Sequence, residues 1–157
     1  MKFKISYFYN VRHLKPNQVP VSTAMFDPKW FHNNKGNNHL FIDKNGVVNG
    51  VRVNALVPDA TCNNLCQGRE KCYTHPNICK FLEAYRKQLS NLDFVEVTNK
   101  IAEGIRRIVE KNPMYNGEEP ECILMVYETP SNICSERVPL KEWFLSHGVM
   151  LEEFTRN

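Results

Sequence analysis

Four cysteines lie close together in the middle of the sequence, with a spacing typical of a metal-binding loop. The pattern C-x3-C-x5-C-x6-C is formed by Cys62, Cys66, Cys72 and Cys79. Thiolate sulfur binds Zn²⁺ tightly, and four such ligands complete its tetrahedral shell. We therefore predict a zinc ion held by these four residues. Its role would be structural, because no coordination position remains open to a substrate.

Other interpretations of the cysteine cluster remain open. His75 could replace one of the cysteines, an iron–sulfur cluster also takes four cysteines, and the loop could hold no metal at all. The remaining cysteines, Cys122 and Cys134, lie far downstream. In a reducing compartment, clustered cysteines hold metal more often than they form disulfides.

A second group of reactive side chains follows an apolar run, in the segment 128–137. Its candidate catalytic residues are Glu128, Cys134 and Arg137. Glu128 could act as a general base, Cys134 could form a thiolate just before a helix, and Arg137 could bind an anion bidentately. The alternative is an ordinary turn before a helix, capped by Ser135 or Glu136, with Cys134 packed as a small hydrophobe.

We expect these residues to line a pocket that favours a phosphate or a carboxylate. Ligands of parallel α/β sheets bind at the carboxyl ends of strands, where helix N-termini attract anions. The candidate ligand-binding residues are Tyr7, Ser22, Trp30 and Ser135. Trp30 could stack on a base, although such aromatic residues also plug the end of a core.

Strands must position these residues, and the apolar patterns predict four of them, over 4–9, 19–24, 122–127 and 149–154. The uninterrupted apolar run 122–127 is typical of a strand covered on both faces of a parallel sheet. Segments 39–43 and 47–56 flank Asn45-Gly46, a strong hairpin signal.

Helical spacing of apolar residues predicts helices that include 81–89 and 97–108, and a last helix covers 139–147. Asp93, with Glu96 three residues later, predicts an N-cap, and Asp27 before Pro28 predicts another for a short helical turn over 26–31. The order of elements predicts a single three-layer α/β domain over residues 1–157. Its sheet is mostly parallel but mixed, with a hairpin insertion and an inserted cysteine-rich loop over 57–80.

Composition supports a single domain and excludes several classes of protein. The chain has 157 residues, of which 42% are hydrophobic, enough for one core. It contains no signal peptide and no apolar run of about 20 residues, so we expect a cytosolic protein with no membrane partner. Twenty Lys and Arg against seventeen Asp and Glu give a net charge of +3, too mild to imply nucleic acid by itself.

Six short segments carry a resemblance to a known family. They cover residues 6–9, 21–23, 28–31, 123–130, 134–137 and 140–144. In these segments the sequence resembles the domain of unknown function 488 family, and most closely its phage and bacterial members with a cysteine-rich middle. In that family a hydrophobic strand ends in an acidic residue, and a Cys-His-Arg triplet opens a helix.

The resemblance implies an α/β fold and a pocket built from the first strand, the Ser22 segment and the Cys134 loop. The histidine of the family's triplet is absent, because Ser135 and Glu136 stand between Cys134 and Arg137. If that histidine carries chemistry in the family, this chain has either lost the role or moved it to Glu136.

Three functional hypotheses follow. The first is an enzyme directed at nucleotides or nucleic acid, with Glu128, Cys134 and Arg137 in its pocket. The second is a non-catalytic binder that sequesters a phosphorylated ligand or a partner protein. The third is a zinc-containing nucleic-acid module whose cations are Lys71, Lys80, Arg86 and Lys87.

Overall fold

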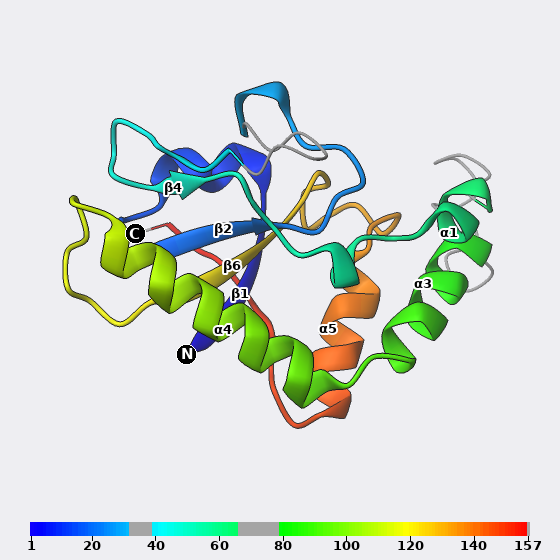
Figure 1. The fold of residues 1–157 in the computed structure, drawn as a ribbon. Helices are drawn as coiled ribbons and strands as arrows, with labels where there is room; N and C mark the ends of the chain where they lie inside the picture. Colours follow the sequence, from blue (N-terminus) through cyan, green and yellow to red (C-terminus); the bar gives the residue numbers. More distant parts are fainter. Residues whose placement is uncertain (32–38, 66–78, 157) are drawn as a thin grey trace.

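The structure, a computed structural model, describes residues 1–31, 39–65 and 79–156. A five-stranded sheet forms its centre, and the strand order is β5-β2-β6-β1-β7 (Figure 1). The strands are β1 (Lys2–Tyr7), β2 (Gln18–Ser22), β5 (Val51–Arg52), β6 (Glu121–Val126) and β7 (Glu152–Glu153). Every pairing in this sheet is parallel. This confirms the predicted α/β class and the predominance of parallel strands.

A separate two-stranded sheet contains the only antiparallel pairing among the described strands. It consists of β3 (Phe41–Ile42) and β4 (Val48–Asn49), which confirms the predicted hairpin. The N–H of Gly46 donates to the carbonyl of Asp43 (3.0 Å) to close the turn. The predicted strand 47–56 does not continue through Gly50, which divides it into β4 and β5. Gly50 has a φ of +93°, and a Cβ there would collide with the carbonyl oxygen of His39.

Strand β6 is the central strand of the large sheet, as the apolar run predicts. Residues Cys122–Val126 are fully buried, and β6 pairs with β2 on one side and with β1 on the other. Leu124 and its alternate neighbours belong to one core cluster, whereas Ile123 and Met125 belong to a second. The sheet is therefore covered on both faces.

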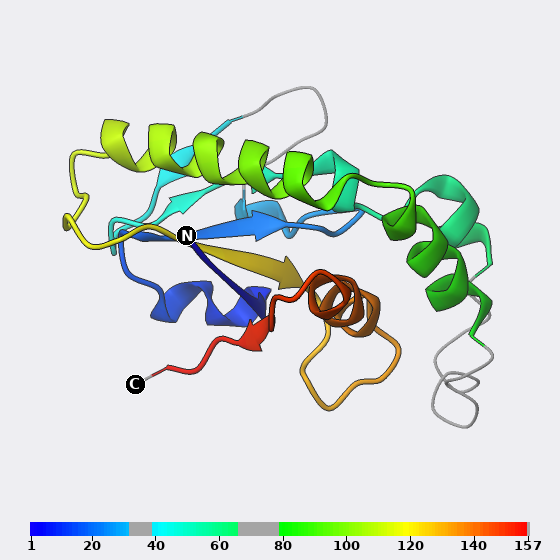
Figure 2. The same cartoon turned by 90° about the horizontal axis from the view of Figure 1, so that it is seen from below.

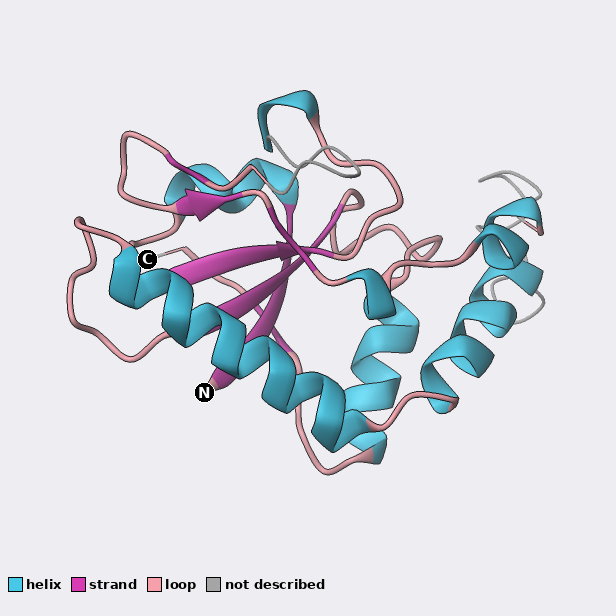
Figure 3. Cartoon of the chain, viewed as in Figure 1, coloured by secondary structure: helices cyan, strands magenta, loops and turns pink. Residues whose placement is uncertain are grey.

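Helices of different kinds cover the two faces. The α-helices are α1 (Ala60–Asn64), α3 (Lys80–Ser90), α4 (Phe94–Lys111) and α5 (Arg137–Ser146). The 3₁₀ helices are η1 (Phe8–His13), η2 (Lys29–Phe31) and η3 (Asn54–Leu56). Figure 2 shows α4 and η1 on opposite sides of the sheet, and Figure 3 shows how loops join the strand ends to the helices. The apolar residues of α3, α4 and α5 pack in one core and those of η1 and η2 in the other.

Local signals set several helix boundaries. The Asp93 side chain accepts a hydrogen bond from the N–H of Glu96 (3.0 Å), which confirms the predicted cap of α4. The predicted first strand is too long at its C-terminal end, because Phe8 turns into η1 and packs in the core. Helix α5 begins at Arg137, two residues earlier than predicted, because Pro139 is tolerated in its first turn.

Pro20 lies inside β2 at a position where a missing N–H costs nothing. The N–H of Thr23 points to β6, and the carbonyl of Ser22 points to the β5 side. Backbone groups alternate along a strand, so Pro20 faces the same side as Ser22, where β5 has not yet begun.

Among the described residues, none of the helices is both long and apolar enough to cross a membrane.

Candidate functional site

The carboxyl ends of four parallel strands meet at one edge of the sheet. Tyr7 is opposite Val126, Ser22 is opposite Met125, and Arg52 is opposite Ser22. Side chains at these positions, and those that follow them, therefore gather at the edge where parallel sheets bind ligands. We call this region the carboxyl edge. It contains two polar clusters and a group of exposed aromatic side chains.

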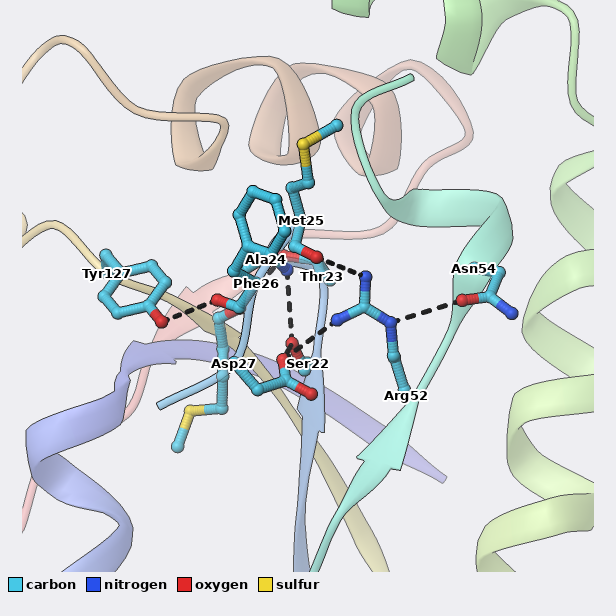
Figure 4. Close-up of polar contacts among 10 residues, drawn as sticks. Ser22, Thr23, Ala24, Met25, Phe26, Asp27, Arg52, Asn54 and Tyr127 are labelled. Atoms are coloured by element: carbon cyan, nitrogen blue, oxygen red, sulfur yellow. Dashed lines mark hydrogen bonds and ion pairs between the residues drawn. The ribbon is translucent and has the colours of Figure 1, made fainter. Parts of the chain in front are cut away.

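The first cluster, which we call the Ser22 cluster, consists of Ser22, Asp27 and Arg52 (Figure 4). The Ser22 hydroxyl donates to Oδ1 of Asp27 and accepts from the N–H of Ala24 (3.2 Å). Nη1 of Arg52 also donates to Oδ1 of Asp27 (3.0 Å). All three side chains are more than nine-tenths buried. Ser22, predicted as a ligand-binding residue, is thus engaged inside the protein.

The remaining nitrogens of Arg52 are also occupied. Nη2 donates to the carbonyl of Met25 (2.9 Å), and Nε donates to Oδ1 of Asn54 (3.3 Å). Burial raises the pKa of Asp27, while its contacts with Ser22 and Arg52 oppose that shift. Because these bonds hold the carboxylate, the prediction that Asp27 caps the helical turn at 26–31 is wrong. The turn itself is present as η2.

The second cluster is a pair of carboxyl groups, which we call the acid pair. Glu128 follows β6 and is half-buried, whereas Glu136 is buried directly before α5. Burial, followed by the nearby charge of Glu128 and a side-chain hydrogen bond with it, raises the pKa of Glu136 to about 8. Glu136 therefore keeps its proton near neutral pH.

Arg137 is buried beside the acid pair and ties three elements together. Its Nη1 donates to the carbonyl of Glu128 (2.5 Å), and its Nε lies 2.5 Å from Oε1 of Glu153. Lys141 lies 3.1 Å from the same oxygen. The charge of Arg137 is thus balanced by Glu153 of β7, although neither its Nε nor its Nη2 has a hydrogen-bond partner among the described residues. The predicted anion-binding role is replaced by a link between β6, α5 and β7.

Two further predicted residues belong to the loop before α5. Ser135 is fully buried, and its hydroxyl accepts a hydrogen bond from the N–H of Arg137 (3.1 Å). It therefore caps the start of α5 and does not face a ligand. Cys134 is half-buried, and its N–H donates to Oδ1 of Asn132 (2.9 Å).

Tyr127 connects the two clusters. Its hydroxyl donates to the carbonyl of Phe26 (2.6 Å), which precedes Asp27 (Figure 4). Partial burial raises the pKa of Tyr127, and the charges of Asp27 and Glu128 raise it further. The phenol therefore lies within electrostatic reach of both clusters, which makes them neighbours along the carboxyl edge.

Large aromatic side chains are exposed at the same edge, and we call them the aromatic surface. Its members and their exposed fractions are Tyr9 (52%), Phe26 (69%), Trp30 (47%) and Tyr127 (48%). Buried Phe8 supports two of them, with ring-centroid distances of 6.3 Å to Trp30 and 4.9 Å to Tyr127. The predicted residue Tyr7 is half-buried and stacks on Tyr9 at 6.2 Å. Trp30 is therefore a surface residue with a core neighbour, rather than a plug of the core.

Three cavities between described residues lie elsewhere. The largest, of about 640 Å³, is a groove between β5 and α4, and others of about 450 and 250 Å³ lie beside the N-terminus and the hairpin. None of these three is lined by the residues predicted to form the pocket, namely Tyr7, Ser22, Glu128, Cys134 and Arg137.

Only part of the predicted metal site falls in the described chain, because Cys66 and Cys72 lie outside it. Cys62, in α1, is buried in the core, and its Sγ lies 3.5 Å from Oε1 of Gln88. Burial and the neighbouring Asp59 raise the pKa of Cys62 to about 11. No group of three or more potential metal ligands occurs among the described residues.

Cys79 directly precedes α3, far along that helix from Cys62. Cys62 packs in the same core as Tyr85 and contacts Gln88, which are six and nine residues after Cys79. At a rise of about 1.5 Å per residue, Cys62 therefore lies about 9–13 Å from residue 79 along the axis of α3. Two sulfurs on one zinc lie only about 4 Å apart. The four-cysteine site stays a prediction, as does the replacement of one cysteine by His75.

Sequence reasoning missed three residues of the site, Asp27, Arg52 and Tyr127. Asp27 had been assigned to a helix cap, and Tyr127 to the end of a buried strand. Arg52 ends a strand of only two residues, which carries no periodic signal. The contact of Arg52 with Asp27 depends on β5 lying beside β2, a register that a single sequence does not encode locally.

Comparison with known proteins gives no further assignment. No protein-family model matches the chain, and no curated protein or solved structure matches it. The resemblance to the domain of unknown function 488 family therefore remains a prediction.

Proposed function

We propose that the carboxyl edge is the active site of an enzyme that acts on nucleotides by general acid–base catalysis. One observation carries this proposal. A half-buried carboxylate, Glu128, lies close to a buried carboxyl, Glu136, beside exposed aromatic side chains at the ligand-binding edge of a parallel sheet.

The acid pair supports the chemistry because its two members differ in protonation. Two neighbouring carboxyl groups do not both ionise readily, so environment separates their roles into acid and base. Glu128, the more accessible member, takes a proton from an attacking water or hydroxyl group. Glu128 then gives that proton to the leaving group, while Glu136 keeps its own proton near neutral pH and lies beside Glu128 throughout.

The aromatic surface supports the choice of substrate. Aromatic faces bind nucleobases by stacking, and such binding tolerates any base because every base has a π-face. Trp30 and Tyr127 are both about half exposed and both pack on Phe8. A base stacked on Tyr127 therefore brings its sugar close to Glu128, the next residue in the chain.

The alternative is a non-catalytic binder that uses the same edge. It is favoured by the engagement of Arg137 and Ser22 within the protein, which leaves fewer groups for chemistry. In this case the aromatic surface would hold a nucleotide-like ligand, and Cys134 and Glu128 would only border it.

Intrinsic fluorescence tests the nucleotide binding that both proposals require, because the chain has two tryptophans and only one of them is exposed. In a Trp143→Phe variant the signal reports Trp30 alone. We expect quenching on titration with nucleoside monophosphates, and loss of binding in Trp30→Ala. Absence of quenching by any of the four common nucleotides would contradict both proposals.

Product analysis of the same nucleotides then tests catalysis. We expect Glu128→Gln to lower turnover by about 10²–10⁴-fold. The matched control is Glu142→Gln on α5, an exposed residue paired with Arg86. Binding without turnover in the wild-type protein would favour the binder.

We also propose that the cysteine-rich loop holds a structural zinc, with Cys66, Cys72, His75 and Cys79 as ligands, and that the protein acts in the cytosol. The support for both proposals is the clustering of these residues within 14 positions, because clustered thiols in a reducing compartment hold metal more often than they form disulfides. No catalytic step involves this metal.

A further inference from the structure

Cationic side chains continue the aromatic surface along η1. The guanidinium of Arg12 lies 3.9 Å from the centroid of the Tyr9 ring, and its Nε donates to the carbonyl of Tyr9 (3.2 Å). Tyr9 remains half exposed with Tyr7 and Arg12 in place. Tyr9 therefore joins an aromatic ring and a guanidinium group at the surface, and about half of its side chain stays exposed.

A second arginine extends this surface toward the C-terminus. Nη1 of Arg156 lies 2.8 Å from Nε2 of His13, whose ring is 6.2 Å from that of Tyr9. Figure 1 shows η1 running from the carboxyl end of β1 toward the C-terminus. Arg12 and Arg156 therefore lie on one continuous stretch of surface with Tyr9.

These two arginines have no acidic partner in the part of the chain that the structure describes. Arg52, Arg86 and Arg137, in contrast, each pair with an acidic side chain. Arg12 and Arg156 are thus available to an external anion next to exposed aromatic rings.

We propose that this surface binds a single-stranded nucleic acid, with bases stacked on the aromatic surface and phosphates on Arg12 and Arg156. The inference rests on the proposed function, because it makes the nucleotide at the acid pair one unit of a polymer. Interleaved cations and aromatic rings match the alternation of phosphate and base in a single strand. A duplex is excluded as the preferred ligand because its base faces are stacked internally.

The length of η1 matches a short stretch of single-stranded nucleic acid. Six residues of 3₁₀ helix span about 12 Å, comparable with two to four stacked nucleotides. Only the local charge is needed for such a site, so the mild net charge of +3 does not oppose it.

Fluorescence anisotropy with labelled oligonucleotides tests the inference in the full chain. The probes are DNA and RNA single strands of about ten nucleotides, a duplex of the same sequence, and a labelled mononucleotide. We expect either single strand, or both, to bind at least tenfold more tightly than the duplex and the mononucleotide. The comparison of DNA with RNA identifies which polymer is preferred.

Substitutions locate the binding surface. Tyr9→Ala should weaken oligonucleotide binding by about 5- to 150-fold, whereas Tyr9→Phe should retain it because the ring remains. Arg12→Ala with Arg156→Ala should lower the slope of log affinity against log salt by about 1.4, since each phosphate contact contributes about 0.7. The charge-matched control, Arg106→Ala with Arg107→Ala, lies on exposed positions of α4, across the sheet from η1.

The outcomes distinguish the two proposals. Equal binding of the single strand and the duplex, or an unchanged salt slope in the Arg12 and Arg156 variant, would overturn the inference. Mononucleotide binding at Trp30 and turnover through Glu128 would in that case still support the proposed function. Tight single-strand binding that depends on Tyr9, with turnover unaffected by Glu128→Gln, would instead support the inference and contradict the catalytic proposal.

Discussion

The Ser22 cluster and the acid pair both lie at the carboxyl edge and both contain a buried acidic side chain, but their charges are balanced differently. Asp27 has a cation of its own, because Nη1 of Arg52 lies 3.0 Å away. Beside the acid pair, Arg137 is instead engaged by Glu153 at 2.5 Å. The pair therefore carries one more carboxyl group than its local cations neutralise.

This difference separates a structural network from a chemical one. A buried carboxylate with a cation and a hydroxyl donor can stay ionised, and its contacts fix the loop that carries it. Glu136 has beside it only an arginine that Glu153 also engages, and its burial favours the protonated carboxyl, which prepares it for acid–base work. We infer that Asp27 holds the aromatic surface in place, while Glu128 and Glu136 act on what binds there.

The largest expected effect comes from breaking the Ser22 cluster. Arg52→Met should lower the free energy of unfolding by about 3–5 kcal/mol, because it leaves the buried Asp27 carboxylate without its cation. Urea denaturation measures the change. The matched control is Arg86→Met, which breaks an exposed pair with Glu142 and should cost less than about 1 kcal/mol.

A double variant sharpens this test. Asp27→Asn combined with Arg52→Met should recover part of the lost stability, because no unpaired charge is left buried. If Arg52→Met costs no more than the Arg86 control, the Ser22 cluster is not the structural element that we describe.

A smaller effect is expected in the pH dependence of stability, through Glu136. Its pKa rises from an ordinary value of 4.5 in the unfolded chain to about 8 in the folded protein. Between these values the folded state holds a proton that the unfolded state has lost, so the free energy of unfolding falls as pH rises across this window. We expect a fall of roughly 1–4 kcal/mol from this group.

Glu136→Gln should remove that slope, since the amide does not titrate and keeps the shape of the protonated acid. Denaturation curves recorded from about pH 5 to pH 8 give the measurement. The control, Glu142→Gln, should leave the slope intact because Glu142 is exposed on α5. A slope that persists in Glu136→Gln would assign the titration to another group.

Substitutions in the cysteine-rich loop should have the smallest effect on the structure and activity of the carboxyl edge. Purified protein should carry about one zinc per chain. Cys79→Ser should release the metal, whereas Cys62→Ser should retain it, because the Cys62 thiol is packed against Gln88 in the core. Elemental analysis measures both. Release of zinc by Cys62→Ser would restore the four-cysteine site and require α1 to lie elsewhere.

Much of the fold could be predicted because its signals are local. The apolar run that became β6 and the cap at Asp93 each depend on a few neighbouring residues. The errors arose where tertiary contacts override a local pattern. Phe8 has strand propensity, but the second core takes its side chain only if the chain turns into η1.

The site was less predictable than the fold, for a physical reason. Glu128 could be found because it follows a recognisable strand, but the burial of Glu136 beside it depends on how α5 docks. The same docking places Glu153 against Arg137 and withdraws that arginine from any ligand. Such pairings join residues that are distant in sequence, and residue types alone do not reveal them.

The titration of Glu136 is the most direct test of the central claim. Carboxyl-carbon NMR of protein with ¹³C-labelled glutamate, assigned with Glu136→Gln, gives its pKa in the free protein and with a bound nucleoside monophosphate. We predict a pKa near 8 for Glu136 in the free protein, and a change in that pKa when the nucleotide binds. A pKa near 4.5 that does not respond to any nucleotide would contradict the assignment of the acid pair as the catalytic centre.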